Sequence, residues 1–168
     1  SPPRPGTTLG ELGETTLQIA YFDCFSGAGG DMIVASLIDA GASPDALRER
    51  LAALGLAGYG LTIDRVSKRG IAASRFLVEL DDSQKHPHRH LKHIVQILEA
   101  GRLPERVFDK AKRVFTRLAE AEAAVHGTTI EKVHFHEVGA IDAVLDIVGA
   151  VIALEMLGVE EVHCSPVV

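Results

Sequence analysis

The segment HFHEVGAIDAVLDIVGAVIALEML, residues 134–157, places the strongest constraint on how this chain can fold. Between Val138 and Leu154 it carries only two charges, Asp142 and Asp146, which a helix would place one turn apart. A helix this apolar must be covered by other elements on most of its surface. Like charges at this spacing repel, and burying an unpaired carboxylate is costly or forces it to take up a proton. The two acids therefore need a facing cation, arginines or lysines from another helix, or local backbone groups to cap.

Composition and charge limit the classes of protein to consider. The 168 residues fit one domain with a real core, and 46% apolar and 24% charged residues are ordinary for a globular protein. The two aspartates interrupt the longest apolar run, so we expect no membrane span, and no signal for secretion precedes the fold. The net charge of −6 argues against a polymeric nucleic acid as partner. We expect a cytoplasmic protein in which Cys24 and Cys164 are reduced, buried, small hydrophobic residues.

Strand and helix signals alternate along the chain and are interrupted by one hairpin. Residues 1–17 are rich in Pro, Gly and Thr, and we expect a flexible leader or a cloning-derived extension. The segment 59–82 has two β-rich arms joined around Lys68-Arg69-Gly70. We therefore expect an α/β fold, a single domain over residues 18–168 with a mixed sheet, in which this antiparallel hairpin is packed by about five helices. The chain ends on Pro-Val-Val, so we expect it to be the amino-terminal part of a longer protein. The other expected elements are strands at 17–25 and 159–168 and helices at 32–42, 43–55, 91–100, 104–127 and within 138–157.

Local signals define the ends of several helices. Ser43 and Pro44 suit the cap and first position of the helix 43–55. The helix from Pro104 has an apolar face predicted from Val107, Val114, Leu118 and Val125, which recur near helical spacing.

A glycine-rich turn, SGAGGD at 26–31, lies between a predicted strand and a predicted helix. Glycines let backbone approach a ligand closely, and the N–H groups of a helix start favour an anion. The turn lacks the Lys and Ser/Thr of a Walker A motif. It can also be a plain tight turn with Asp31 near the positive end of the helix dipole. The candidate phosphate-binding residues are Ser26, Gly27, Gly29, Gly30 and Asp31.

Two histidine groups have the spacing of metal ligands. His86, His88 and His90 alternate, as do His134 and His136, so in extended backbone each group can present its imidazoles on one face. Glu137 follows the second group directly, and Asp142 and Asp146 follow on the helix. The first group can equally be a solvated loop. The candidate metal ligands are His86, His88, His90, His134, His136 and Glu137, supported by Asp142 and Asp146.

Three motifs in this order, DCFSGAGGDM (23–32), HPHRHLKHI (86–94) and HFHEVGAIDAVLDIVG (134–149), resemble the amino-terminal part of the LarC-type nickel insertion proteins. The resemblance implies a nickel chelatase of the lyase class. Such an enzyme inserts nickel into pyridinium-3,5-bisthiocarboxylic acid mononucleotide and forms the nickel-pincer nucleotide cofactor of lactate racemase-like enzymes. It also implies dependence on CTP, which a carboxyl-terminal domain absent from this chain would bind with a divalent metal.

The resemblance suggests roles for the motifs. The first histidine group would capture nickel, the second would position it against the thiolated mononucleotide, and the glycine turn would hold the phosphate; one joint metal site is equally compatible. We expect a homo-oligomer in the full-length form, a nickel-pincer-dependent racemase as recipient, and a chain that is not catalytically complete alone. Two other functions fit clustered histidines and aspartates: a metal-dependent phosphohydrolase, or a non-catalytic module that stores or delivers metal.

Overall fold

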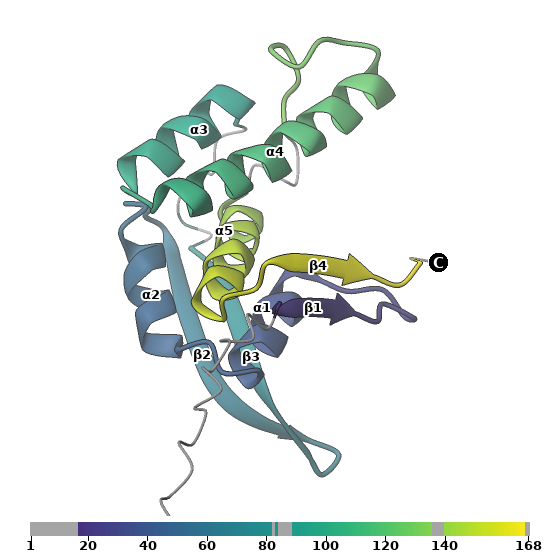
Figure 1. Cartoon of the computed structure of the whole chain (residues 1–168). Helices are drawn as coiled ribbons and strands as arrows, with labels where there is room; N and C mark the ends of the chain where they lie inside the picture. Colours follow the sequence, from purple (N-terminus) through teal and green to yellow (C-terminus); the bar gives the residue numbers. More distant parts are fainter. Residues whose placement is uncertain (1–16, 82, 84–88, 136–139, 167–168) are drawn as a thin grey trace, which may run out of the picture.

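The computed structural model describes residues 17–81, 83, 89–135 and 140–166 (Figure 1). Within these residues the strands are β1 (Ile19–Phe22), β2 (Tyr59–Lys68), β3 (Ile71–Leu80) and β4 (Glu161–Cys164). The helices are α1 (Gly30–Asp39), α2 (Pro44–Ala52), α3 (Leu91–Ala100), α4 (Glu105–His126) and α5 (Ile141–Met156). The expected α/β fold with five helices and a hairpin is confirmed.

Helix α5 lies at the centre of the molecule, as its apolar sequence requires (Figure 1). It contacts α1, α2, α4 and β3, and its residues Val144, Leu145, Val148 and Ile152 are fully buried. Neighbouring elements pack closely at Gly149, where a Cβ would lie 3.4 Å from Val34 Cγ2, at the edge of ordinary contact distance. None of the described helices is long and apolar enough to cross a membrane.

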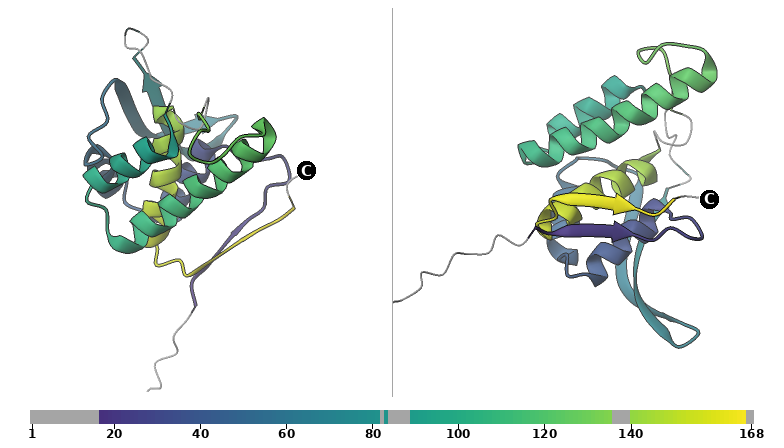
Figure 2. Two further views of the ribbon diagram at one scale, coloured as in Figure 1. Left: turned by 90° about the horizontal axis from the view of Figure 1, so that it is seen from above. Right: turned by 45° about the vertical axis from the view of Figure 1, so that its right-hand side comes forward.

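The strands form one parallel and one antiparallel pair, each a separate two-stranded sheet. Strands β2 and β3 pair in register from Tyr59–Leu80 to Lys68–Ile71. Arg69 and Gly70 connect them with positive φ angles of 53° and 82°, which is the geometry of a type I′ turn. Strands β1 and β4 lie side by side and parallel, although they come from opposite ends of the described chain (Figure 2).

The predicted helix ends agree with the structure where the local signal is strong. Ser43 Oγ accepts a hydrogen bond from Ala46 N at 3.3 Å, and Pro44 opens α2. Gly127 ends α4 in the left-handed conformation, and its N–H donates to the Ala123 carbonyl.

The predicted apolar face of α4 was partly wrong. Val107 is buried, but Val114 and Val125 are 39% and 81% exposed. Small residues carry much of the buried face instead, which comprises Val107, Ala111, Phe115, Ala119 and Ala123 at steps of four. Alanine lets neighbouring elements approach the helix closely, and a search for bulky apolar residues overlooks it.

Candidate functional site

The two histidine segments lie next to each other in the fold. Arg89 and Phe135 form an isolated antiparallel bridge, in which Phe135 N donates to Arg89 O at 3.0 Å. Phe135 is fully buried and anchors this bridge in the core. The bridge brings His90 beside His134, with ring centroids 4.0 Å apart. The last histidine of the first group therefore touches the first histidine of the second.

His90 is oriented by a backbone group. Its Nδ1 lies 2.9 Å from the Val133 carbonyl oxygen. A carbonyl only accepts hydrogen bonds, so Nδ1–H is the donor and the neutral ring has its lone pair on Nε2. Metal-binding histidines are commonly fixed in this way, with the second ring nitrogen bonded to a carbonyl. His90 is therefore prepared to offer Nε2 to a cation.

His93 was not among the predicted ligands, yet it belongs to the same group of rings. Its ring centroid lies 5.4 Å from that of His90, and its Nδ1 accepts a hydrogen bond from His90 N at 3.2 Å. Because Nδ1 is used in this bond, His93 fixes the start of α3 and the position of His90. The signal that could have found it is its place three residues after the helix cap.

The remaining predicted ligands, His86, His88, His136 and Glu137, lie outside the described residues. Among the residues that are described, no three His, Cys, Asp or Glu side chains are placed to hold one metal ion. That His86 and His88 share a metal site with His90 stays a prediction.

Asp146 of α5 lies near a carboxylate from α1, Asp31, and near Asp142 of its own helix. Burial, together with the negative charges of Asp31 and Asp142, raises the pKa of Asp146 from 3.8 to about 6. The backbone N–H of Asp31 donates to the Asp146 carboxylate and partly offsets these effects. Within the described parts of the chain, neither aspartate of α5 pairs with a lysine or arginine. Of the partners considered from the sequence, the described residues thus supply a backbone N–H to Asp146 and no lysine or arginine.

A glycine makes this arrangement possible. A Cβ at Gly30 would lie 2.7 Å from both Cβ and Oδ2 of Asp146, which is closer than real Cβ atoms come. Gly30 is the first residue of α1, so the start of this helix packs directly against the side of α5. The third predicted glycine of the phosphate motif therefore has a packing role.

The rest of the glycine turn is exposed, as a ligand-binding loop must be. Ser26, Gly27 and Gly29 are all exposed. Gly27 has a φ of 80° and donates its N–H to Cys24 O at 3.0 Å, which closes a tight turn. Gly29 N donates to the Met32 sulfur at 3.4 Å. The N–H groups of Gly27, Gly29 and Asp31 thus have acceptors within the protein.

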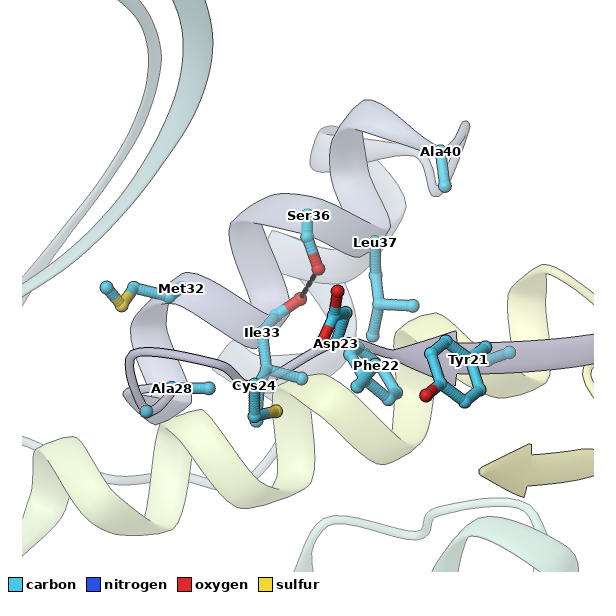
Figure 3. Close-up of a pocket in the computed structure, with 12 residues that line it drawn as sticks. Tyr21, Phe22, Asp23, Cys24, Ala28, Met32, Ile33, Ser36, Leu37 and Ala40 are labelled. Carbon is cyan, nitrogen blue, oxygen red and sulfur yellow. Dashed lines mark hydrogen bonds between the residues drawn. The ribbon is translucent and has the colours of Figure 1, made fainter. Parts of the chain in front are cut away.

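Beside this turn, a hollow of about 470 Å³ lies between β1 and α1 (Figure 3). Tyr21, Asp23 and Cys24 line it from β1 and the residues after it, and Met32 and Ser36 from α1. Its volume falls in the range of small-molecule sites. The sequence did not indicate this hollow, because it depends on the packing of α1 beside β1.

Comparison with known proteins shows extensive similarity to one family. The model of the family described as "Nickel insertion protein" matches residues 20–168. A protein of Geotalea uraniireducens named "Putative nickel insertion protein" is 51% identical over 152 residues, covering 89% of this chain and 38% of the relative. One of Thermomicrobium roseum with the same name is 49% identical over 151 residues, covering 89% and 37%. The chain spans less than two-fifths of the length of these curated relatives. No solved structure matches it.

Proposed function

The chain belongs to the nickel insertion protein family, and from this membership we propose that it provides the nickel-handling part of a chelatase. The substrate we propose is pyridinium-3,5-bisthiocarboxylic acid mononucleotide, and the product is the nickel-pincer nucleotide cofactor. In the longer protein the reaction would depend on CTP bound with a divalent metal in a carboxyl-terminal domain. We place this lyase in the cytoplasm as a homo-oligomer, with a nickel-pincer-dependent racemase receiving the product.

The observation that carries this proposal is the contact between His90 and His134 across the Arg89–Phe135 bridge. It favours one joint nickel site over separate sites for capture and delivery. His86 and His88 precede His90 at alternating positions, and His136 and Glu137 follow His134, so the chain continues from this contact into the other proposed ligands. In this proposal they complete the nickel site.

The chemistry of the donors suits a metal that must be handed over. Neutral imidazoles and a carboxylate bind nickel reversibly, whereas a closed set of thiolates typically forms a structural site. His90 would bind through Nε2, since its Nδ1–H is held by the Val133 carbonyl. When the substrate sulfurs bind nickel, Nε2 of His90 can release the metal while Nδ1 keeps its proton and its hydrogen bond to the Val133 carbonyl.

The hollow beside the glycine turn is the proposed place for the mononucleotide. It has room for a small ligand, and Gly27 and Ala28 of the turn line it, with exposed Ser26 directly before them in the chain. Because several N–H groups of the turn already have acceptors, we propose that the phosphate also bonds the Ser26 hydroxyl. Asp142 and Asp146 would attract the cation that accompanies the phosphate.

Isothermal titration with nickel chloride tests the metal site. We expect His90→Ala and His134→Ala each to weaken nickel binding by about tenfold or more. His126→Ala is the matched control, because His126 ends α4, where it pairs with Glu122 at 3.2 Å, and should leave the affinity unchanged. Equal affinity in all three variants would contradict the joint site.

Titration of the nickel-loaded chain with the thiolated mononucleotide tests the substrate. We expect saturable binding, which a module that only stores metal would not give. Release of phosphate from a simple ester under the same conditions would instead identify a metal-dependent phosphohydrolase.

A further inference from the structure

The pairing of β1 with β4 brings the two cysteines of the chain into contact. Phe22 lies opposite Cys164 in the register, and Cys24 follows two residues later. The Sγ atoms of Cys24 and Cys164 are 3.7 Å apart, although 140 residues separate them in sequence. Both cysteines are free thiols in this structure.

Hydrogen bonds on both strands hold this contact in place. Cys24 N donates to Ser165 Oγ at 2.8 Å, and Ser165 N donates to Phe22 O at 2.9 Å. The backbones on either side of the sulfurs are therefore tied to each other. The sulfurs must approach from 3.7 Å to a disulfide bond length of about 2.0 Å for the bond to form.

The two thiols differ in access to solvent. Cys164 is exposed, whereas Cys24 is 8% exposed, so the prediction of burial was right for Cys24 and wrong for Cys164. The hydrogen bond with Cys164 raises the pKa of the Cys24 thiol, and burial adds to the rise. A reagent in solution therefore reaches the sulfur of Cys164, whereas the sulfur of Cys24 is buried beside it.

We propose that Cys24 and Cys164 form a dithiol site that a low-molecular-weight disulfide such as oxidised glutathione converts to an intramolecular disulfide. The Cys164 thiolate attacks one sulfur of the reagent, which breaks the reagent's S–S bond and releases one glutathione thiolate. The Cys24 thiol then loses its proton to solvent, and its sulfur attacks Cys164 and expels the second glutathione. Two protein thiols are oxidised, and one glutathione disulfide is reduced to two thiols.

The position of the pair links this chemistry to the glycine turn. Cys24 O accepts the hydrogen bond from Gly27 N that closes the turn, and Cys24 lines the hollow between β1 and α1. A disulfide would join this wall of the hollow covalently to β4. Its effect on mononucleotide binding rests on the proposed function, whereas formation of the bond does not.

Intact-mass spectrometry of the 168-residue chain in glutathione buffers tests the dithiol site. We expect oxidised glutathione to remove two hydrogen atoms from the mass, with loss of both reactive thiols and full recovery on adding dithiothreitol. Cys24→Ser should stop at the first step and carry one glutathione on Cys164. Cys164→Ser should stay unmodified, because the sulfur of Cys24 is covered.

Two results would overturn the proposal. The first is a stable glutathione adduct on Cys164 of the unsubstituted chain, with Cys24 still titrating as a thiol. The second is a chain whose mass does not change in the oxidising buffer. Neither result depends on nickel or mononucleotide binding, so the dithiol site can fail while the proposed function stands.

Discussion

Replacing Asp146 with asparagine should stabilise the metal-free protein at neutral pH. The carboxylate is half-buried in α5 and faces Asp31 and Asp142, and these surroundings raise its pKa from 3.8 to about 6. Asparagine has nearly the same size and keeps an oxygen that can accept the N–H of Asp31. The substitution therefore removes the charge and leaves the packing and this hydrogen bond in place.

The magnitude follows from the pKa shift. A shift from 3.8 to about 6 corresponds to at most about 3 kcal/mol of unfavourable free energy for the ionised group. Because Asp146 is only half-buried, solvent screening reduces the expected gain for Asp146→Asn to about 1–2 kcal/mol. This is a measurable fraction of the stability of a small domain.

The pH dependence has a defined sign. Below pH 3.8 folded and unfolded chains both hold the proton, so the carboxyl group carries no penalty and the variant should match the parent. Between 3.8 and about 6 the folded state retains a proton that the unfolded state releases, so the stability contributed by protonation is lost as the pH rises. Above about 6 the penalty is complete and the advantage of Asp146→Asn is largest.

Urea unfolding at pH 4, 5, 6 and 7.5, without metal, measures this difference between the variant and the parent. Histidine titration is common to both chains and cancels in the difference. Asp142→Asn removes one of the two neighbouring negative charges and, because Asp142 is exposed in the first turn of the same helix, should raise stability by less than about 0.5 kcal/mol. If Asp146→Asn were less stable than the parent at pH 7.5, this reasoning would be refuted. The ionised carboxylate of Asp146 would then make an attractive interaction that outweighs the cost of its burial and its repulsion by neighbouring carboxylates.

Three further changes have expected outcomes. Gly30→Ala should lower the free energy of unfolding by about 1–3 kcal/mol in urea titrations, because the added Cβ would overlap Asp146. Gly60→Ala is the control and should cost much less, because a Cβ at Gly60 would meet open space. Gly70→Ala should cost about 1–2 kcal/mol in the same assay, since the hairpin turn holds Gly70 at a φ of 82°; no loss would argue against the type I′ turn. Nickel affinity measured by calorimetry should fall as the pH drops below about 6.5, because imidazole ligands must be neutral to bind; a constant affinity would assign the site to carboxylates or thiolates.

Local signals predicted the parts of the fold that depend on neighbouring residues. Ser43 with Pro44 defined the start of α2, and Lys68-Arg69-Gly70 defined the hairpin turn, because in both cases the backbone conformation is set by the residues themselves. The apolar run of α5 likewise required a central position. Each of these features can be read from fewer than about twenty consecutive residues.

Contacts between distant segments could not be predicted in the same way. The pairing of β1 with β4 and the meeting of Asp31 with Asp146 depend on how the intervening elements pack. The contact between His90 and His134 depends on the Arg89–Phe135 bridge and the bond from His90 to the Val133 carbonyl, which join segments about forty residues apart. Sequence spacing indicated which residues could bind metal, and packing decided which of them lie together.

The start of α1 brings together two features that were separate hypotheses in the sequence. The glycine turn favours an anion there, yet the carboxyl groups of Asp31 and Asp146 already lie at this helix start, and Asp142 adds its charge from one turn away on α5. A phosphate added beside ionised carboxylates is repelled, and at neutral pH Asp146 is mostly ionised because its pKa is about 6. A divalent cation between the phosphate and the carboxylates removes this repulsion and replaces the proton that Asp146 would otherwise take up. On the proposed function, mononucleotide binding therefore requires metal to bind with it, and the unusual pair of acids on an apolar helix serves that requirement at the expense of stability in the metal-free protein.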